Sequence, residues 1–244
     1  MDNHRQMPWH SMQIEEVYRT LGTSAEGLSD AEAAERLRKN GRNELRRKPP
    51  KTISQMLREQ VTDPMVLILI GAAAFSAVLG EWTEAAVIFT IVIINAVIGI
   101  VQEKKAQSSL EALRNMSALT ARALRQKEES IIPAAELVEG DVVYLSDGDM
   151  VPADIRLTES ANLKVQEASL TGESLPSEKE ADAVLPGETV LGDRRNMLYR
   201  SSIVTYGRAV GVVAATGMQT EVGGIAGMLE SEDELDTPLK RKLN

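Results

Sequence analysis

A single carboxylate, Glu173, stands between a glycine and a serine in the segment Thr171-Gly172-Glu173-Ser174. Gly172 has no Cβ, so the backbone can turn tightly there and a large group can come close to it. Thr171 and Ser174 carry hydroxyls that can bond back to the loop backbone and fix its shape. These residues predict a rigid, exposed loop with one acid at its tip. A turn capped by hydroxyls, with Glu173 merely solvated, fits the same four residues, because short motifs often occur by chance.

Composition excludes several other kinds of catalytic and metal site. The 244 residues contain no cysteine, which removes disulfides, thiolate metal sites and a cysteine nucleophile. The two histidines, His4 and His10, both lie near the start of the chain, so a histidine metal site or a Ser-His-Asp triad is not expected. We therefore expect this chain to bind no metal ion and no cofactor through its own residues.

Charge is unevenly distributed along the chain, whose net charge is −9. Residues 130–197 carry 14 acids and 5 bases, whereas residues 42–58 carry 6 bases and a single acid, Glu44. An acidic main domain argues against a nucleic-acid partner. The basic segment directly precedes an apolar one and needs another explanation.

Two uncharged apolar runs, 64–80 and 85–102, are separated by a short polar link. Each is near the short end of the roughly 17–25 residues that a membrane helix requires. The second run is rich in Ile and Val, but an open strand of that length could not satisfy its backbone in lipid. We expect two membrane helices joined as a hairpin, with Asp63-Pro64 starting the first. A buried helical pair in a soluble protein is the alternative.

The charges that flank the two runs predict their orientation. Basic residues stay on the cytoplasmic side of a membrane. The link between the runs carries only Glu81 and Glu84. The bases that lie outside the pair are Arg46, Arg47, Lys48, Lys51 and Arg58 before it, and Lys104 and Lys105 after it. We expect a multi-pass protein of the cell membrane with both ends of this chain cytoplasmic, its basic segment near anionic headgroups of the lipid bilayer.

The second apolar run carries polar residues at a helical spacing. Asn95, Gly99 and Glu103 are four residues apart and would share one face. Such a face in a membrane helix usually meets protein or water rather than lipid. Two helices cannot bury it, so we expect further membrane helices and an incomplete chain. Beyond Glu103 a charged amphipathic extension to about residue 113 predicts a cytoplasmic stalk.

After the stalk the hydrophobic pattern changes to a period of two, which predicts a compact β-sandwich or jelly-roll-like domain. The expected strands are 142–145, 155–157, 163–165, 189–191, 197–204 and 209–214, with a turn at Gly207-Arg208 between the last two. A helix is expected to start near Thr220.

The first fifty residues predict a small helical hairpin. Ser11 is expected to cap a helix that ends near Gly22. The pattern Ser29-Asp30-Ala31-Glu32 is typical of a capping box, and Gly41 follows the end of that helix. Pro49-Pro50 would break the chain after it.

Taken together, the motifs resemble the N-terminal part of a P-type cation-transporting ATPase, and are most similar to bacterial calcium-transporting ATPases. They follow one another in the family's order from about Ile14 to the end of the chain. The matching segments are 27–43, 63–67, 95–103, 148–154, 170–174, 196–199, 215–217 and 237–239. The sequence departs from the family pattern at Glu139, where proline is usual, at Gly224, where lysine is common, and at Arg200-Ser201-Ser202.

The resemblance implies a chemistry for the loop. ATP would phosphorylate an aspartate on a separate domain, and an actuator domain would swing its Thr-Gly-Glu-Ser loop onto that phosphate. Glu173 would orient and deprotonate the attacking water, Gly172 would permit close approach, and Thr171 and Ser174 would hold the loop geometry. No phosphorylation motif or nucleotide-binding domain is found in these residues. ATP, Mg²⁺ and the transported cation, expected to be Ca²⁺, would therefore be handled elsewhere in the complete pump, and this chain alone should be inactive.

These arguments predict an α+β membrane protein with four parts. They are an N-terminal helical segment (1–55), a transmembrane pair (56–103), an actuator domain with its stalk (104–232) and a linker to a third membrane helix (233–244). Its partners would be the remaining domains of the same pump. The alternatives are a pump for Mg²⁺, Na⁺ or H⁺, and a stand-alone membrane-anchored β-domain with a regulatory or binding role.

Overall fold

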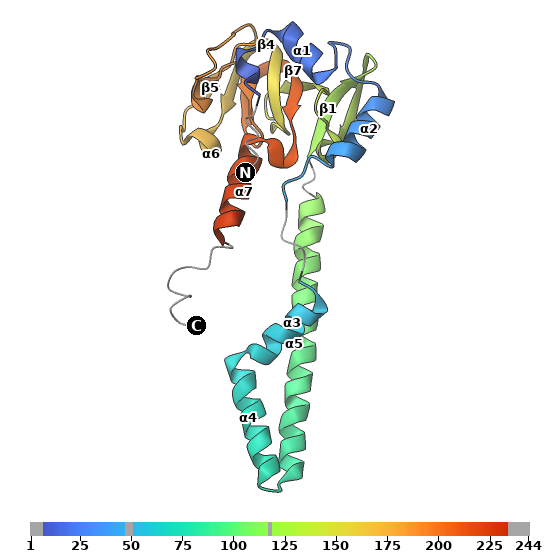
Figure 1. Ribbon diagram of the computed structural model, residues 1–244, viewed down its shortest axis with the longest axis vertical. Helices are drawn as coiled ribbons and strands as arrows, with labels where there is room; N and C mark the ends of the chain where they lie inside the picture. Colours follow the sequence, from blue (N-terminus) through green and yellow to red (C-terminus); the bar gives the residue numbers. More distant parts are fainter. Residues whose placement is uncertain (1–6, 47–50, 117–118, 234–244) are drawn as a thin grey trace. The chain divides into compact units, whose positions relative to one another are not determined.

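The computed structural model describes residues 7–46, 51–116 and 119–233, and the chain forms two compact units (Figure 1). One unit comprises Met1–Arg46 with Ala118–Asn244, and the other comprises Arg47–Ser117. The Pro49-Pro50 break and, apart from Asp233, the linker expected at 233–244 lie outside the described residues.

The smaller unit is helical and consists of α3 (Ile53–Thr62), α4 (Pro64–Val78) and α5 (Trp82–Met116). Thr52 and Gln55 form a capping box at the start of α3. Oδ1 of Asp63 accepts hydrogen bonds from the N–H groups of Met65 and Val66, at 2.9 and 3.4 Å, so the predicted start of the first apolar helix is confirmed. Helix α5 begins three residues earlier than expected and continues through the charged extension as one helix.

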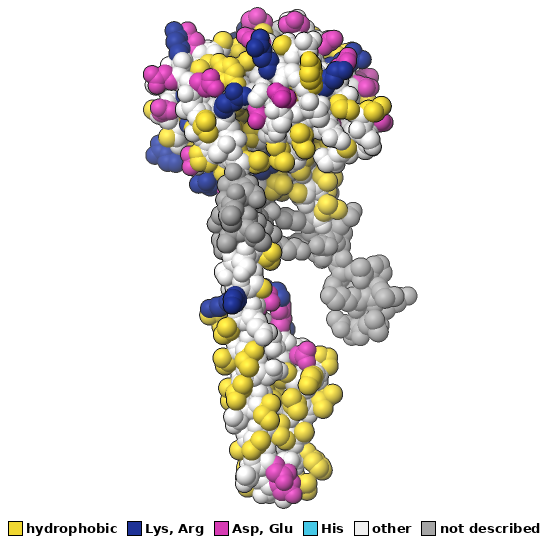
Figure 2. Space-filling model, turned by 180° about the vertical axis from the view of Figure 1, so that it is seen from behind, with side chains coloured by type: hydrophobic (Ala, Val, Ile, Leu, Met, Phe, Trp, Pro, Cys, Tyr) yellow, Lys and Arg dark blue, Asp and Glu magenta, His cyan; other side chains and the backbone are white. Residues whose placement is uncertain are grey.

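Apolar side chains cover the outside of this helical unit (Figure 2). Val78, Ile68 and Met65 are 86%, 73% and 70% exposed. Of the described helices, α5 alone is long and apolar enough to cross a membrane; the pair α3 and α4, bent by 68°, would count as a second span only if taken together. The 15 residues of α4 extend about 22 Å, less than the roughly 30 Å of a bilayer core. The expected two-helix transmembrane hairpin is therefore not confirmed.

Helix α3 covers part of the polar face of α5. A Cβ added to Gly99 would lie only about 2.8 Å from the side chain of Gln60, which is too close. Lys51, just before α3, is 4.0 Å from the carboxylate of Glu103. Asn95 remains exposed. The close approach at Gly99 explains why a glycine interrupts this apolar helix.

The larger unit is built on one antiparallel sheet, so the expected β-rich domain is confirmed. Its described strands follow the order β2-β1-β3-β7-β4-β5, and β6 also pairs with β4, so they are not divided between two separate sheets. The strands are β1 (Thr120–Arg125), β2 (Glu128–Pro133), β3 (Val142–Ser146), β4 (Asp154–Gln166), β5 (Ser177–Glu178), β6 (Met197–Leu198) and β7 (Ile203–Ala215). Valine, leucine, isoleucine and alanine side chains from most of these strands form a single buried cluster.

The two long strands correct the predicted turns. Segments 155–157 and 163–165 belong to one strand, β4, and the segments expected on either side of Gly207 belong to one strand, β7, from Ile203 onward. Gly207 has a φ of +86° and lies against the carbonyl groups of Ala161 and Asn162, where the β4–β7 register shifts. A glycine in this conformation permits a β-bulge, so the strand bends and continues instead of turning back.

Other predicted elements were wrong or were missed. No strand forms at 189–191, because Thr189 closes a turn onto the carbonyl of Pro186 and the 3₁₀ helix η3 (Leu191–Asp193) follows. Strands β1 and β2, η2 (Ala134–Glu136), α3 and the short helix α6 (Ala168–Thr171) were not predicted. The helix expected near Thr220 is α7 (Glu221–Asp233), preceded by η4 (Gly217–Gln219).

The N-terminal segment packs against the sheet through η1 (Trp9–Ser11), α1 (Ile14–Leu21) and α2 (Asp30–Asn40). Val17 and Leu21 form a buried cluster with Val212 of β7. Ser29 caps α2 by accepting from the N–H of Glu32, which confirms half of the predicted capping box; the Glu32 carboxylate pairs with Arg36 instead of returning to Ser29. Ser11 does not cap α1, which starts after Gln13; its hydroxyl closes η1 onto Pro8 instead.

Candidate functional site

Residues 171–174 lie at the end of α6, between β4 and β5 of the sheet. The base of this segment is a short antiparallel pairing, in which Lys164 faces Glu178 and Val165 faces Ser177. Val165 is fully buried, whereas residues 172–176 are exposed. The segment is therefore an exposed loop anchored on a buried strand.

Gly172 ends α6 in the left-handed conformation, with φ +78° and ψ −6°. Its N–H donates to the carbonyl of Ala168 at 3.0 Å. No atom lies within 4 Å of the place where its Cβ would be, so conformation rather than crowding favours glycine here. The backbone turns sharply at this residue and presents the next two to solvent.

Thr171 connects the two ends of the turn through its hydroxyl. Its Oγ1 donates to the carbonyl of Glu167 at 3.2 Å and accepts from the N–H of Glu173 at 3.3 Å. The hydroxyl of Ser174 forms no hydrogen bond with the residues that the structure describes. The backbone of Glu173 is thus held through Thr171, while Ser174 is exposed.

The carboxylate of Glu173 is exposed and has no hydrogen-bond or ion-pair partner in the described part of the chain. A carboxylate in this position can accept a hydrogen bond or a proton from a molecule brought to the loop. It is neither buried in the domain core nor used to stabilise a turn. Leu175 beside it is 80% exposed, so the loop tip also offers an apolar contact.

Two other acids of the sequence motif 148–154 have structural roles. Oδ2 of Asp149 accepts from the N–H and the hydroxyl of Ser146, at 2.8 and 3.0 Å, and closes the turn after β3. Asp154 is buried and accepts from the N–H groups of Arg200 and Glu221. Neither carboxylate is free to take part in chemistry at the loop.

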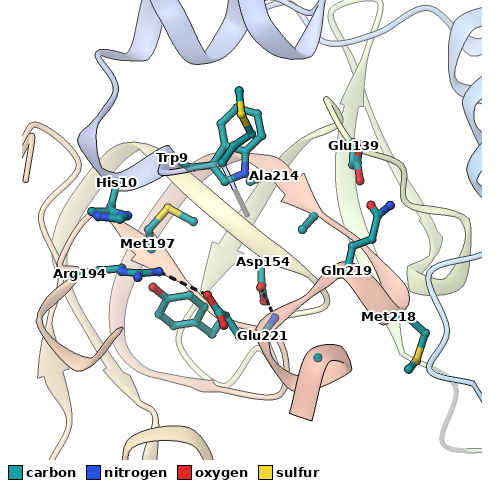
Figure 3. A pocket seen from close by; sticks show the side chains of 14 residues that line it. Trp9, His10, Glu139, Asp154, Arg194, Met197, Ala214, Met218, Gln219 and Glu221 are labelled. Carbon is teal, nitrogen blue, oxygen red and sulfur yellow. Dashed lines mark hydrogen bonds and ion pairs between the residues drawn. The ribbon is translucent and has the colours of Figure 1, made fainter. Parts of the chain in front are cut away.

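A cavity of about 460 Å³ lies elsewhere in the same unit, beside the start of α7 (Figure 3). It was not predicted from sequence. Its polar wall contains an ion pair between Arg194 and Glu221, 3.3 Å apart, and the buried carboxylate of Asp154. Its apolar wall is formed by side chains from separate segments, including Trp9, Met197, Ala214 and Met218. Burial and the nearby Arg194 lower the pKa of His10 at its edge.

None of residues 171–174 lines this cavity, and two of its three acidic residues, Asp154 and Glu221, are engaged with α7 and Arg194; the third is Glu139. Among the described residues, no group of three or more His, Asp or Glu side chains could hold a metal ion. The exposed loop is therefore the better candidate for chemistry.

Comparisons with known proteins identify the domains to which these residues belong. The P-type ATPase actuator domain model matches residues 115–230, and the N-terminal model of cation transporters and ATPases matches residues 9–76. The chain is 47% identical over 234 residues to calcium-transporting ATPase 1 of Lactococcus lactis, covering 96% of this chain and 26% of the relative.

Two further relatives show the same coverage. The calcium-transporting ATPase of Bacillus subtilis is 41% identical over 97% of this chain and 27% of its own length. The probable cation-transporting ATPase F of Mycobacterium tuberculosis is 40% identical over 96% of this chain and 26% of its own length. The chain thus spans about a quarter of the length of these relatives. With both domain models matched in order, the chain belongs to the P-type cation-transporting ATPase family, of which it contains the N-terminal segment and the actuator domain.

Proposed function

We propose that this chain is the actuator-bearing part of an ATP-driven cation pump, in which Glu173 promotes hydrolysis of an aspartyl phosphate carried by another domain. The observation that supports this most directly is the exposed carboxylate of Glu173, which has no partner among the described residues and sits on a backbone held by Thr171. A general base must reach a reactant that arrives from outside its own domain, and this carboxylate is placed to do so.

The proposed step is a displacement at phosphorus. The oxygen of a water molecule attacks the phosphorus, the bond between phosphorus and the aspartate oxygen breaks, and the carboxylate of Glu173 takes a proton from the water. The products are inorganic phosphate and a free aspartate. Such a positioned base is worth roughly 10²–10⁴-fold in rate. Gly172 leaves room for the phosphoryl group, and Thr171 holds the loop geometry through its two hydrogen bonds. Ser174, whose hydroxyl has no partner among the described residues, would contribute to that geometry only once the loop is docked.

ATP and Mg²⁺ belong to the complete pump and are handled by domains beyond this chain. Rotation of the actuator, transmitted through the helices that connect it to the membrane, would couple the hydrolysis step to alternating ion access, as in other rigid-body domain motions. The partners of this chain are accordingly the remaining domains of the same polypeptide.

The transported cation is proposed to be Ca²⁺, because two of the relatives described above are named calcium-transporting ATPases. The test is the cation that the purified pump needs to form phosphoenzyme from ATP. With Mg²⁺ and ATP present throughout, phosphoenzyme formation should require micromolar Ca²⁺. Phosphoenzyme that forms without Ca²⁺ and depends instead on Na⁺, on H⁺ or on no cation besides Mg²⁺ would make the protein a pump for another ion. A protein that forms no phosphoenzyme with any of them would favour the stand-alone β-domain.

We also propose that α4 and α5 both lie in the membrane, with both ends of the chain cytoplasmic. The exposed apolar surface of these helices and the bases that flank them support this orientation. The chain has no cysteine, so single cysteines report cleanly on sidedness. In intact cells a membrane-impermeant thiol reagent should label Glu81→Cys, between α4 and α5, but not Glu180→Cys in the actuator. Labelling of Glu180→Cys alone would reverse the orientation.

The catalytic proposal is tested in the complete pump with Glu173→Gln, which keeps the size of the side chain and removes its basicity. Phosphoenzyme should form from ATP at a normal level and then decay roughly 10²-fold or more slowly after a chase. Glu180→Gln, an exposed acid close to the same hairpin, is the matched control and should decay normally. Normal decay in Glu173→Gln would remove Glu173 from the catalytic role.

A further inference from the structure

A buried ion pair lies at the base of the loop that carries Glu173. Nζ of Lys179 is 2.7 Å from Oε1 of Glu167, and each side chain is only 1% exposed. Glu167 directly precedes α6 and Lys179 directly follows β5, so the two residues flank the loop in sequence and meet beneath it. Burial raises the pKa of Glu167 and lowers the pKa of Lys179, and their mutual attraction opposes both changes.

Burying both charges is unfavourable, and the pair is unlike the other ion pairs on this hairpin. Transfer of an ion from water to a protein interior costs several kcal/mol, so an apolar pair of similar size often gives an equally stable fold. Lys164 of β4 and Glu178 of β5, which pair at the base of the same loop, form an exposed ion pair at 3.0 Å instead. Stability alone therefore does not account for the buried pair, which calls for a role in geometry.

The backbone of Glu167 carries the hydrogen bonds that shape the loop. Its carbonyl accepts from the N–H groups of Leu170 and Thr171, at 2.9 and 3.0 Å, and from the hydroxyl of Thr171 at 3.2 Å. That hydroxyl in turn accepts from the N–H of Glu173. A continuous series of hydrogen bonds thus runs from Glu167 to the backbone of the proposed base.

Lys179 is fixed from three other directions. Its backbone N–H donates to the carbonyl of Leu163 in β4 at 3.0 Å, and its Nζ donates to the carbonyl of Arg194 at 3.4 Å. Nζ also lies 5.8 Å from the centre of the Tyr199 ring, a cation–π contact in a desolvated site. Through Lys179, the side chain of Glu167 is tied to the rigid part of the domain.

We propose that the Glu167–Lys179 ion pair positions the Glu173 loop for hydrolysis of the aspartyl phosphate. The inference rests on the proposed function of Glu173. Both residues act on the position of the loop and neither touches the reacting atoms. Without the two charges the side chain of Glu167 is no longer attracted to Lys179. The backbone of Glu167, which accepts the hydrogen bonds of the loop, can then shift. A displacement of about 1 Å at a reacting group can cost on the order of 10²-fold in rate.

The test compares Glu167→Gln, Lys179→Met and the double variant in the complete pump. The double variant leaves no unpaired buried charge, so its thermal unfolding temperature should stay close to that of the parent, whereas each single variant should be less stable. Its phosphoenzyme should nevertheless form normally and decay about 10- to 100-fold more slowly. Hydrogen exchange should be faster at the amides of residues 170–174 and unchanged in β7. Lys164→Met, which removes the exposed pair on the same strands, is the control and should decay normally.

The outcomes separate this inference from the function on which it rests. Normal decay and normal amide exchange in the double variant, with slow decay in Glu173→Gln, would overturn the positioning role and leave the catalytic proposal intact. Normal decay in Glu173→Gln would overturn the catalytic proposal itself. Slow decay in the single variants that is fully restored in the double variant would show that the pair matters for stability only, and would also overturn the positioning role.

Discussion

Oδ2 of Asp154 accepts a hydrogen bond of 2.7 Å from the backbone N–H of Glu221, the first residue of α7 (Figure 3). Its other oxygen accepts from the N–H of Arg200 at 2.9 Å. Thr220 supplies a second cap, because its hydroxyl accepts from the N–H of Gly223. A buried carboxylate at a helix N-terminus satisfies free N–H groups and interacts favourably with the helix dipole. Asp154, the first residue of β4, therefore holds the start of α7 against the sheet.

The first prediction concerns this attachment. Asp154→Ala removes the acceptor of two buried N–H groups, and we expect a loss of about 1–3 kcal/mol in the free energy of unfolding. Hydrogen exchange in the detergent-solubilised chain should be faster at the first amides of α7. Asp147→Ala, at an exposed turn directly before the motif 148–154, should change neither quantity. Unchanged exchange at Glu221 in Asp154→Ala would show that Thr220 alone holds the helix.

The second prediction is a pH dependence of stability. Burial raises the pKa of Asp154 from 3.8 to about 6, although the N–H groups of Arg200 and Glu221 oppose the rise. Below about pH 4 the carboxyl is protonated in both the folded and the unfolded chain. Between about pH 4 and pH 6 the unfolded chain loses the proton first, so rising pH favours unfolding, by about 3 kcal/mol in total.

The pH dependence is measured as the difference between the parent and Asp154→Asn, which does not titrate. Denaturant unfolding from pH 4 to pH 7 should show the parent losing stability relative to the variant as pH rises, with no further change above about pH 6. A difference that is constant over this range would mean that Asp154 titrates at its ordinary pKa in the fold.

The third prediction concerns Arg156, which is buried and forms no ion pair with a carboxylate in the described part of the chain. Its guanidinium donates to six backbone carbonyls, and burial lowers its pKa to about 10. The acceptors are the carbonyl oxygens of Trp9, Met12, Leu157, Ala181, Ala183 and Asn196. They come from the N-terminal segment, from β4 and from the long connection before β6, so one side chain joins three segments distant in sequence.

We expect Arg156→Met to lose more than about 3 kcal/mol of stability, because several buried carbonyls lose their donors together. Arg156→Lys should lose less but still be clearly destabilised, since an ammonium has three donors and cannot reproduce the planar fork. Arg195→Met, at a neighbouring exposed arginine, is the control. The measurement is denaturant unfolding. Equal stability of the lysine variant and the parent would show that charge, and not the fork geometry, holds the segments together.

The fourth prediction concerns Asn43, which joins the N-terminal segment to the rest of its unit. Its Nδ2 donates to the carbonyls of Ala134 and Pro152, and its Oδ1 accepts from Gly217 and Arg200. Asn43→Asp has the same shape but turns a carboxylate oxygen towards two carbonyl oxygens.

We therefore expect Asn43→Asp to be at least as destabilising as Asn43→Ala at neutral pH, by about 2–4 kcal/mol, through the burial of an unsatisfied charge. Limited proteolysis should then cut the N-terminal segment first. Asn40→Asp, which adds the same charge at an exposed position, should have little effect. An aspartate variant as stable as the parent would contradict the assigned amide orientation.

Sequence signals predicted the structural features that depend on neighbouring residues, and they missed those that depend on contacts distant in sequence. Ser29, Gly22 and Asp63-Pro64 marked helix ends correctly because a cap needs only its own turn. Gly207 was misread as a turn because the sequence cannot reveal the bulge that β4 imposes on it. Glu167 and Lys179 gave no signal, because a charge in a polar stretch is normally solvated and the contacts of Lys179 with Tyr199 and Arg194 join residues distant in sequence.

The fifth prediction distinguishes two reasons for a glycine at position 172, its backbone conformation and the space around it. Gly172 and Gly207 have similar φ angles, +78° and +86°, so alanine at either position should cost about 1–2 kcal/mol in backbone strain. At Gly207 a Cβ would also overlap the carbonyl groups of Ala161 and Asn162, whereas at Gly172 it meets no atom. Gly207→Ala should therefore be far more destabilising than Gly172→Ala in denaturant unfolding.

The effects on phosphoenzyme breakdown should have the opposite order, with Gly172→Ala slower than Gly207→Ala. In the complete pump Gly172→Ala should form phosphoenzyme normally yet break it down slowly, because in the proposed mechanism the new methyl group lies where the phosphorylated domain approaches. Gly207→Ala, in whatever fraction folds, should break its phosphoenzyme down at the parental rate per folded molecule. If Gly172→Ala instead broke down its phosphoenzyme as fast as the parent, close approach of the phosphoryl group to this backbone would be excluded. The loop would then have to reach its substrate through the Glu173 side chain alone.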